Sequence, residues 1–265
     1  MATPATSQRL YDATRRTASK VLSVALQVRA GAGSLLLPPA CAMCGESRDD
    51  ESAVSLCEPC HEVLSVGYSA CPCCASRDPL LADDGRCGAC RDRRFRFRWA
   101  AALGTYDGRL REAVLRTKKP TEHCLTNTLA ELLWQRCGER LRAFRPDAVV
   151  AVPMHWWHRL RRGGNGPDIV CEVLAKRLDV MSAPNLLARR RNTLPQSNLA
   201  HGRRKLNVRR AFRVRSSYVL EGARLILVDD ILTSGATAHE AAGTLREAGA
   251  AEVAIAVIAR ADRPA

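Results

Sequence analysis

Four Cys-x-x-Cys pairs between residues 41 and 90 limit the fold of this chain more than any other feature. Twelve residues separate the first pair from the second and the third from the fourth, so one unit occurs twice. Two such turns bring four thiolates to one tetrahedral Zn²⁺ and leave no open position for catalysis. A polar segment of this size lacks a sufficient core, so a bound metal would supply its stability. The pattern predicts two structural zinc ions, held by Cys41, Cys44, Cys57, Cys60, Cys71, Cys74, Cys87 and Cys90.

The spacing leaves the pairing of the turns open. Adjacent turns can share a zinc ion, or the turns can interleave. The internal repeat favours adjacent turns, because each half is then self-sufficient. Cys73 is a surplus thiol able to exchange with a neighbouring ligand, and His61 is an alternative ligand beside a complete cysteine set. The segment resembles a double zinc ribbon, whose role is either structural support or contact with a nucleic acid or protein partner.

The cysteine spacing also bears on the compartment. Paired turns favour metal binding over disulfides, which indicates a reducing environment, and we expect a cytoplasmic protein. Three further cysteines, Cys124, Cys137 and Cys171, fall on expected helices and are predicted to be buried thiols. No apolar run approaches the roughly 18 residues that a membrane-spanning helix needs.

Three parts follow from the sequence pattern. Residues 1–38 are expected to form a helical leader, residues 39–92 the double zinc ribbon and residues 93–265 an α/β domain. In the last part strand patterns alternate with helix patterns, which predicts a mostly parallel sheet with helices on both faces. The expected strands cover 95–99, 148–152, 225–228 and 253–259, and the expected helices cover 108–118, 125–143, 167–178 and 236–248.

The first of these strands has an unusual composition. Phe95, Phe97 and Trp99 alternate with arginines, which predicts a strand with one apolar and one basic face. The same interleaving of aromatic rings and arginines is typical of surfaces that stack single-stranded nucleic acid. The two interpretations are compatible, and the strand is favoured.

The stretch from Leu225 to Thr237 carries the chemistry of the α/β part. Four aliphatic residues lead into Asp229 and Asp230, which precede a small, hydroxyl-rich loop of Thr233, Ser234, Gly235, Ala236 and Thr237. Ligands of open α/β sheets bind at the carboxyl ends of strands, and a glycine loop entering a helix offers N–H groups to a phosphate. Adjacent carboxylates suit sugar hydroxyls or Mg²⁺. The stretch predicts a ribose phosphate site with a metal nearby, because a helix cap alone needs only one hydroxyl.

Over all thirteen positions the stretch resembles the phosphoribosyl-pyrophosphate (PRPP) signature of the type I phosphoribosyltransferases. The resemblance implies a type I phosphoribosyltransferase-like fold that binds PRPP with Mg²⁺. Asp229 and Asp230 would contact the ribose as the catalytic acids, and residues 233–237 would hold the 5′-phosphate. Thr233 stands where many members of that group carry a catalytic aspartate, which weakens the case for proton transfer from this position.

The combination of Cys-x-x-Cys pairs with this signature resembles the ComF family of competence-related proteins. Residues 152–155 resemble its Val-Pro-x-His segment, residues 161–166 its Arg-Gly-Phe-Asn-Gln loop, and further matches run from Arg191 to Phe212. Gly164 and Gly166 replace an aromatic residue and a glutamine, which predicts a more mobile loop with weaker ligand contacts. The resemblance implies pyrophosphate or flexible-loop roles for Pro153, Met154, His155, Arg162, Gly163 and Asn165.

Charge is concentrated in one segment of a chain whose net charge is +14. Residues 189–215 contain ten lysines and arginines and no acid, which favours a polyanionic partner such as single-stranded DNA. A solvated basic face, or a rim around the pyrophosphate, would account for the same pattern. The candidate nucleic-acid contacts are Arg191, Arg203, Arg204, Lys205, Arg209 and Arg210.

Two functions fit these features. The family resemblance implies a PRPP–Mg²⁺ protein that acts with single-stranded DNA in DNA uptake, as a phosphoribosyltransferase whose acceptor the sequence does not identify. The alternative is a non-catalytic, zinc-stabilised nucleic-acid-binding protein in which PRPP is a regulatory ligand or a vestige. Protein partners that bind through the zinc ribbon are a further expectation.

Overall fold

The computed structural model describes residues 39–48, 52–77, 85–91, 94–153, 166–190 and 208–262. In this part of the chain, no helix has the length and apolar character needed to cross a membrane. The predicted leader helix lies outside the described residues. So do nine predicted site residues, namely Met154, His155, Arg162, Gly163, Asn165, Arg191, Arg203, Arg204 and Lys205.

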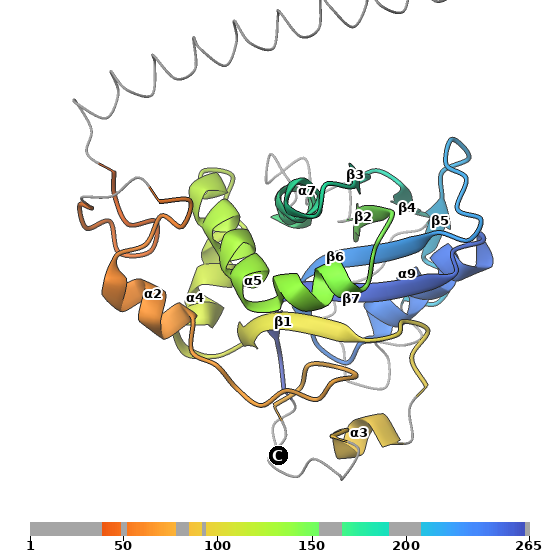
Figure 1. Cartoon of the computed structure of the whole chain (residues 1–265), viewed down its shortest axis with the longest axis horizontal. Coiled ribbons are helices and arrows are strands. Elements are labelled where there is room, and N and C mark those ends of the chain that lie inside the picture. The colour runs from red at the N-terminus through yellow and green to blue at the C-terminus, as the bar shows by residue number, and fades with distance from the viewer. Residues whose placement is uncertain are drawn as a thin grey trace, which may run out of the picture.

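A five-stranded parallel sheet forms the centre of the molecule, in the order β1-β7-β6-β2-β3 (Figure 1). A separate antiparallel pair, β4 and β5, lies beside α9. The helices are α2 (Glu58–Leu64), α3 (Gly88–Arg91), α4 (Gly108–Arg116), α5 (His123–Ala143), α7 (Gly166–Leu178) and α9 (Ala236–Glu247). The strands are β1 (Ala100–Thr105), β2 (Ala148–Ala151), β3 (Met181–Ser182), β4 (Leu187–Arg189), β5 (Phe212–Val214), β6 (Arg224–Leu232) and β7 (Glu252–Arg260).

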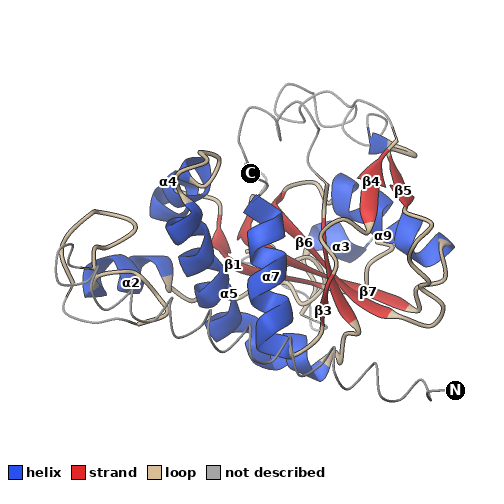
Figure 2. Cartoon of the chain, turned by 90° about the horizontal axis from the view of Figure 1, so that it is seen from above, coloured by secondary structure: helices blue, strands red, loops and turns tan. Residues whose placement is uncertain are grey.

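Both faces of the sheet are covered, and β6 shows how. Ile226 and Val228 point into a core shared with α4, α5 and α7. Leu225 and Leu227 point into a second core shared with α9, β4 and β5. Successive side chains of a strand face opposite sides, so a strand buried on both faces has to be aliphatic throughout. This explains the uninterrupted apolar run that predicted β6, and Figure 2 shows the helices on both sides of the sheet.

The connections define where a ligand can enter. The chain leaves β2 through α7 towards β3, and it leaves β6 through α9 towards β7. The helices α7 and α9 belong to opposite cores. The neighbouring strands β2 and β6 therefore form the topological switch point of the sheet, and ligands of open α/β sheets bind beside the carboxyl ends of strands at such a point.

The predicted strand over residues 95–99 is wrong, because the strand there begins only at Ala100. The last two residues of the predicted segment still bond to β7, through the Arg98 N–H and the Trp99 carbonyl. Phe95 and Phe97 stack with their ring centroids 4.5 Å apart, while Trp99 packs in the other core at 5.5 Å from the Phe144 ring. The rings of Phe97 and Trp99 are buried in these cores, and base stacking by this segment stays a prediction.

The first cysteine module shares its core with the α/β part. Met43, Leu56 and Leu64 belong to the same buried cluster as α4 and α5. The Arg116 guanidinium of α4 donates to the Met43 carbonyl at 2.5 Å and to the Ala42 carbonyl at 2.8 Å. The module is therefore fixed to the sheet's helical layer by apolar burial and by charge-assisted hydrogen bonds.

Candidate functional site

The described residues contain two four-cysteine clusters, and in each the four Sγ atoms lie within 4.8 Å of one another. The Sγ atoms of Cys44 and Cys57 are 3.5 Å apart, and those of Cys74 and Cys87 are 3.6 Å apart. A tetrahedron of 2.3 Å Zn–S bonds has edges of about 3.8 Å, so both clusters fit zinc. Adjacent turns supply each cluster, as the repeat favours. The sets are Cys41, Cys44, Cys57 and Cys60, then Cys71, Cys74, Cys87 and Cys90.

Both clusters are built on the same local structure. An isolated β-bridge closes the loop around the first turn of each module, between Ala40 and Ser47 and between Ala70 and Arg77. The second turn of each module then begins a short helix, α2 or α3. The sequence repeat is therefore also a structural repeat, in which each half assembles its own cluster.

The electrostatics of the clusters also fit a cation. Burial raises the pKa of Cys41, but backbone N–H groups of Cys44, Cys57 and Met43 outweigh it and lower the pKa to about 6. Burial and the neighbouring thiols raise the pKa of Cys60 and Cys90. Four thiolates therefore repel one another unless a divalent cation lies between them. Zinc would supply that charge and link the turns of each module.

The remaining cysteines have mixed environments. Cys171 is buried on α7, where burial raises its pKa to about 11 and its thiol donates to the Val149 carbonyl at 3.1 Å. Cys137 is partly buried. Cys124 is exposed at the start of α5, so the prediction that it is buried is wrong. Cys73 packs beside the second cluster without belonging to its four ligands.

The acid pair lies inside a strand. β6 continues to Leu232, so the predicted end at Val228 is wrong and both acids belong to the strand's carboxyl-terminal part. Asp229 keeps its ladder pairing with Val257. Its Oδ1 accepts the Asp230 N–H at 2.9 Å, and the Asp230 Oδ1 accepts the next N–H at 2.8 Å. Both carboxyl groups are thus held against their own backbone, half-buried at the strand end.

Asp229 is the acid of the pair whose pKa is shifted by its surroundings. Burial raises its pKa well above the ordinary value, and the neighbouring charge of Asp230 raises it further. Arg189 of β4 opposes the shift. Burial lowers the pKa of that arginine, and its Nε donates to the Pro153 carbonyl at 2.8 Å. A ligand that brings a cation or hydroxyl donors to this position would relieve the cost of the charged carboxylate.

The loop between β6 and α9 requires glycine at one position. Gly235 has φ +75°, a left-handed conformation that other residues adopt with strain. A Cβ at this position would come within 2.8 Å of the Phe95 ring. The glycine therefore allows the Phe95 ring to pack against the loop. The helix α9 begins at Ala236, directly after Gly235. The Ser234 hydroxyl accepts the Ala236 N–H at 3.4 Å, so the loop is a tight entry to the helix.

The structure brings part of the predicted site together. The register aligns Ala151 of β2 with Val228 of β6, so Pro153 follows β2 beside the level of the acid pair. This puts the described start of the predicted pyrophosphate segment next to the predicted ribose site. Arg209 and Arg210 are exposed in the turn before β5. They line a cavity beside α9, and Asp229 and Asp230 are not among its lining residues.

Arg260 was not predicted, yet it connects the loop to the second cysteine module. Its side chain is buried at the end of β7, with 8% of the residue exposed. Its Nε donates to the Cys74 carbonyl at 3.0 Å, and its Nη1 donates to the Leu232 and Thr233 carbonyls at 2.9 and 2.6 Å. One guanidinium thus joins a zinc turn to the start of the loop. Its one signal in the sequence is an arginine placed directly after the apolar run of residues 253–259.

Comparisons with known proteins agree with this architecture. Residues 32–91 match the double zinc ribbon domain, and residues 172–265 match the phosphoribosyl transferase domain. The chain is 30% identical over 204 residues to DNA utilization protein YhgH of Salmonella typhimurium, covering 75% of this chain and 87% of that protein. It is 28% identical over 210 residues to Competence protein F of Haemophilus influenzae, covering 78% and 90%. The chain belongs to the ComF family. The expected type I phosphoribosyltransferase-like fold with a double zinc ribbon is thereby confirmed for this ComF-family chain.

Proposed function

We propose that this ComF-family chain binds PRPP with Mg²⁺ at the carboxyl end of β6. The observation that carries the proposal is the strand-end pair Asp229 and Asp230, followed by the glycine loop and the N-terminus of α9. The pair lies at the switch point of the sheet and within the region that matches the phosphoribosyl transferase domain. Mg²⁺ would neutralise the phosphates and help to hold PRPP there.

Different residues would hold the ribose, the 5′-phosphate and the pyrophosphate of PRPP. The carboxylates of Asp229 and Asp230 would accept hydrogen bonds from the ribose hydroxyls and stabilise positive charge on the reacting ribose. Residues 233–237 would hold the 5′-phosphate through loop N–H groups, side-chain hydroxyls and the helix dipole. Pyrophosphate contacts from Pro153, Met154, His155, Arg162, Gly163 and Asn165 remain a prediction of the family resemblance.

The proposed role is cytoplasmic and concerns DNA. Relatives are named for competence and for DNA utilization, and this chain has a net charge of +14. A basic chain attracts polyanions at a distance, which suits the handling of single-stranded DNA. Protein contacts through the zinc ribbon are a further proposal, supported by Val63 and Val66, which are exposed on and directly after α2.

In the enzymatic version, a nucleophile attacks the ribose C1, the bond from C1 to pyrophosphate breaks, and pyrophosphate leaves with the electron pair. The acceptor's proton passes to solvent or to a base on the acceptor side. Thr233 favours a second candidate, because it cannot serve as the acid or base that many phosphoribosyltransferases carry here. In that case the chain is a zinc-stabilised nucleic-acid-binding protein with PRPP as a regulatory ligand or vestige.

Calorimetric titration of the zinc-loaded chain with PRPP and Mg²⁺ tests the site. We expect binding that Asp229→Asn/Asp230→Asn weakens by at least about ten-fold, as loss of charge-assisted hydrogen bonds implies. Asp179→Asn changes an exposed aspartate after α7 and should bind as the parent does. Equal binding by the double variant and the parent would refute the site. Pyrophosphate release, with and without single-stranded DNA, then separates the enzyme from the regulated binding protein.

A further inference from the structure

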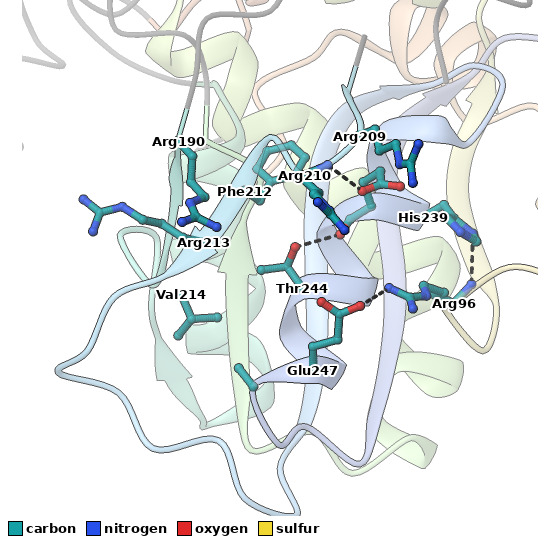
Figure 3. Close-up of a pocket in the computed structure, with 12 residues that line it drawn as sticks. Arg96, Arg190, Arg209, Arg210, Phe212, Arg213, Val214, His239, Thr244 and Glu247 are labelled. Atoms are coloured by element: carbon teal, nitrogen blue, oxygen red, sulfur yellow. Dashed lines mark hydrogen bonds and ion pairs between the residues drawn. The ribbon is translucent and has the colours of Figure 1, made fainter. Parts of the chain in front are cut away.

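A second candidate ligand site lies outside the proposed PRPP site. A cavity of about 720 Å³ opens between α9 and the β4–β5 pair (Figure 3). Its size falls in the range of about 300–1,000 Å³ that is typical of ligand sites. Five arginines line it, together with His239 and Phe212, and the five are Arg96, Arg190, Arg209, Arg210 and Arg213.

The arginines in and next to the β4–β5 pair divide between this cavity and the acid pair. Arg189 and Phe212 are register partners and share one face of the pair. From that face Arg189 bonds to the Pro153 carbonyl and acts on Asp229. Arg190, directly after β4, and Arg213 of β5 line the cavity together with Phe212. The pair thus presents one arginine to the proposed PRPP site and two to the cavity.

The part of the cavity wall formed by α9 leaves room for the Arg96 side chain. Gly243 has no side chain, and a Cβ there would meet the Arg96 Cδ at 2.6 Å, so Arg96 lies directly across the helix. Arg96 then pairs with Glu247 at 2.5 Å, and its N–H donates to His239 Nδ1 at 3.3 Å. The dashed lines of Figure 3 mark these contacts. The Arg96 side chain, which comes from the segment before β1, is therefore held at the edge of the cavity by contacts with α9.

The cavity has an excess of positive charge. Two carboxylates line it against the five guanidinium groups, an excess of three charges. Glu247 pairs with Arg96, and Glu240 accepts the Arg210 backbone N–H at 3.0 Å. Arg190 and Arg213 are exposed on the β4–β5 side, where the described lining residues include no acid. Guanidinium groups bind phosphate through paired N–H donors, so the lining suits more than one phosphate group.

We propose that this cavity binds the phosphodiester backbone of single-stranded nucleic acid. A single strand can bend into a concave site, whereas a stiff duplex would touch only its rim. The spread of the arginines over three segments (Arg96, the β4–β5 pair and the turn before β5) suits a chain of phosphates better than one ion. The proposal deepens the DNA role proposed above by giving it a site, and it does not require PRPP to bind.

Fluorescence anisotropy of the full-length, zinc-loaded chain with a labelled single-stranded DNA oligonucleotide provides the test. Arg190→Gln/Arg213→Gln removes two cavity charges. Lys119→Gln/Lys176→Gln removes two charges from exposed positions after α4 and on α7, and it serves as the matched control. Two lost phosphate contacts should reduce the slope of log K against log salt by about 1.4 and weaken binding by at least about ten-fold at 0.1 M salt. The control should lose less than about three-fold.

Three outcomes would overturn the proposal. The cavity variant could bind DNA as tightly as the parent, or both variants could weaken equally, which would indicate net charge alone. Duplex DNA could also bind as tightly as the single strand and lose as much affinity in the cavity variant. Calorimetry with PRPP and Mg²⁺ is run on the same proteins. Loss of PRPP binding without loss of DNA binding would assign the arginines to the strand-end site and refute the cavity, while failure of PRPP binding in every protein would refute only the PRPP site.

Discussion

At the carboxyl end of β6, Asp229 carries a carboxyl group in surroundings that favour its neutral form. Burial and the charge of Asp230 raise its pKa, and Arg189 only partly offsets them. A carboxyl whose pKa is higher in the folded than in the unfolded chain binds its proton more tightly when folded. Folding is therefore penalised as the pH rises above the ordinary aspartate range and through the raised pKa. In the proposed function, ligand binding recovers this cost.

The first prediction concerns Asp229→Asn in the ligand-free protein. The variant should melt at a higher temperature than the parent at pH 7 to 8. The difference should be about 2–4 °C for each kcal/mol by which removal of the buried charge raises the free energy of unfolding. The difference should shrink as the pH falls towards 4, because the parent carboxyl then becomes protonated. Thermal melts across this pH range give the measurement, with Asp179→Asn as control. A variant less stable than the parent at pH 8 would contradict the assigned strain.

The sequence was informative about the residues of one strand and one loop. Asp229, Asp230 and Gly235 fall in a local signature, where every functional residue is a near neighbour in the chain. Arg189 and Arg260 escape such an analysis, because each reaches the site from a segment that is distant in sequence. Arg260 bonds to Leu232, 28 positions away, and to Cys74, 186 positions away. Only the folded sheet brings these positions together.

At the scale of elements, β7 and the second cysteine module jointly support the loop after β6. Arg260 of β7 donates to the Cys74 carbonyl of the module and to the Thr233 carbonyl of the loop. The Ser76 hydroxyl donates to Asp262, just beyond β7, at 2.6 Å. Phe95, which follows the second cluster in the chain, packs behind Gly235. These contacts connect the second module to the end of β7 and to the loop after β6, whereas the first module contacts α4 and α5.

The second prediction follows from this connection. Arg260→Met removes the guanidinium that donates to the carbonyls of Cys74, Leu232, Thr233 and Ala261. Each hydrogen bond to a charged group is worth about 1.5–3 kcal/mol. PRPP affinity should fall about ten-fold, and hydrogen–deuterium exchange should increase in the loop after β6. Arg116→Met, which cuts the bonds from α4 to the first module, is the matched control and should leave both readouts of the loop unchanged. Equal effects of the two variants would show a general loss of stability and would remove Arg260 from its positioning role.

The elements also show where sequence patterns succeed and fail. The long helices and the aliphatic strands were predicted because burial on one or both faces imposes a clear period. The period of two at 95–99 predicts one apolar face, but Phe97 and Trp99 pack into different cores, so the aromatic residues do not share a face. The strands β4 and β5 have three residues each and were missed, since so short a segment shows no period.

Across the whole molecule, the two cysteine clusters differ in their protection from solvent. All four cysteines of the second cluster are buried, while in the first Cys44 is exposed and only Cys41 is buried. The second module is also held by Arg140 of α5, whose Nη2 donates to the Pro72 carbonyl at 2.6 Å. A chelator reaches a buried metal only when the structure around it opens locally. The clusters should therefore release zinc at different rates.

The third prediction is a two-phase release of zinc to a chromogenic chelator in excess. The first cluster should supply the fast phase and the second cluster a phase at least about ten-fold slower, with equal amplitudes for two ions per chain. Cys60→Ser should abolish the fast phase only, and Cys90→Ser the slow phase only. Exchange measured during release should show the loop after β6 loosening with the slow phase, because Arg260 ties that loop to Cys74. A loop that loosened with the fast phase would mean that the first module, and not the second, supports the proposed PRPP site.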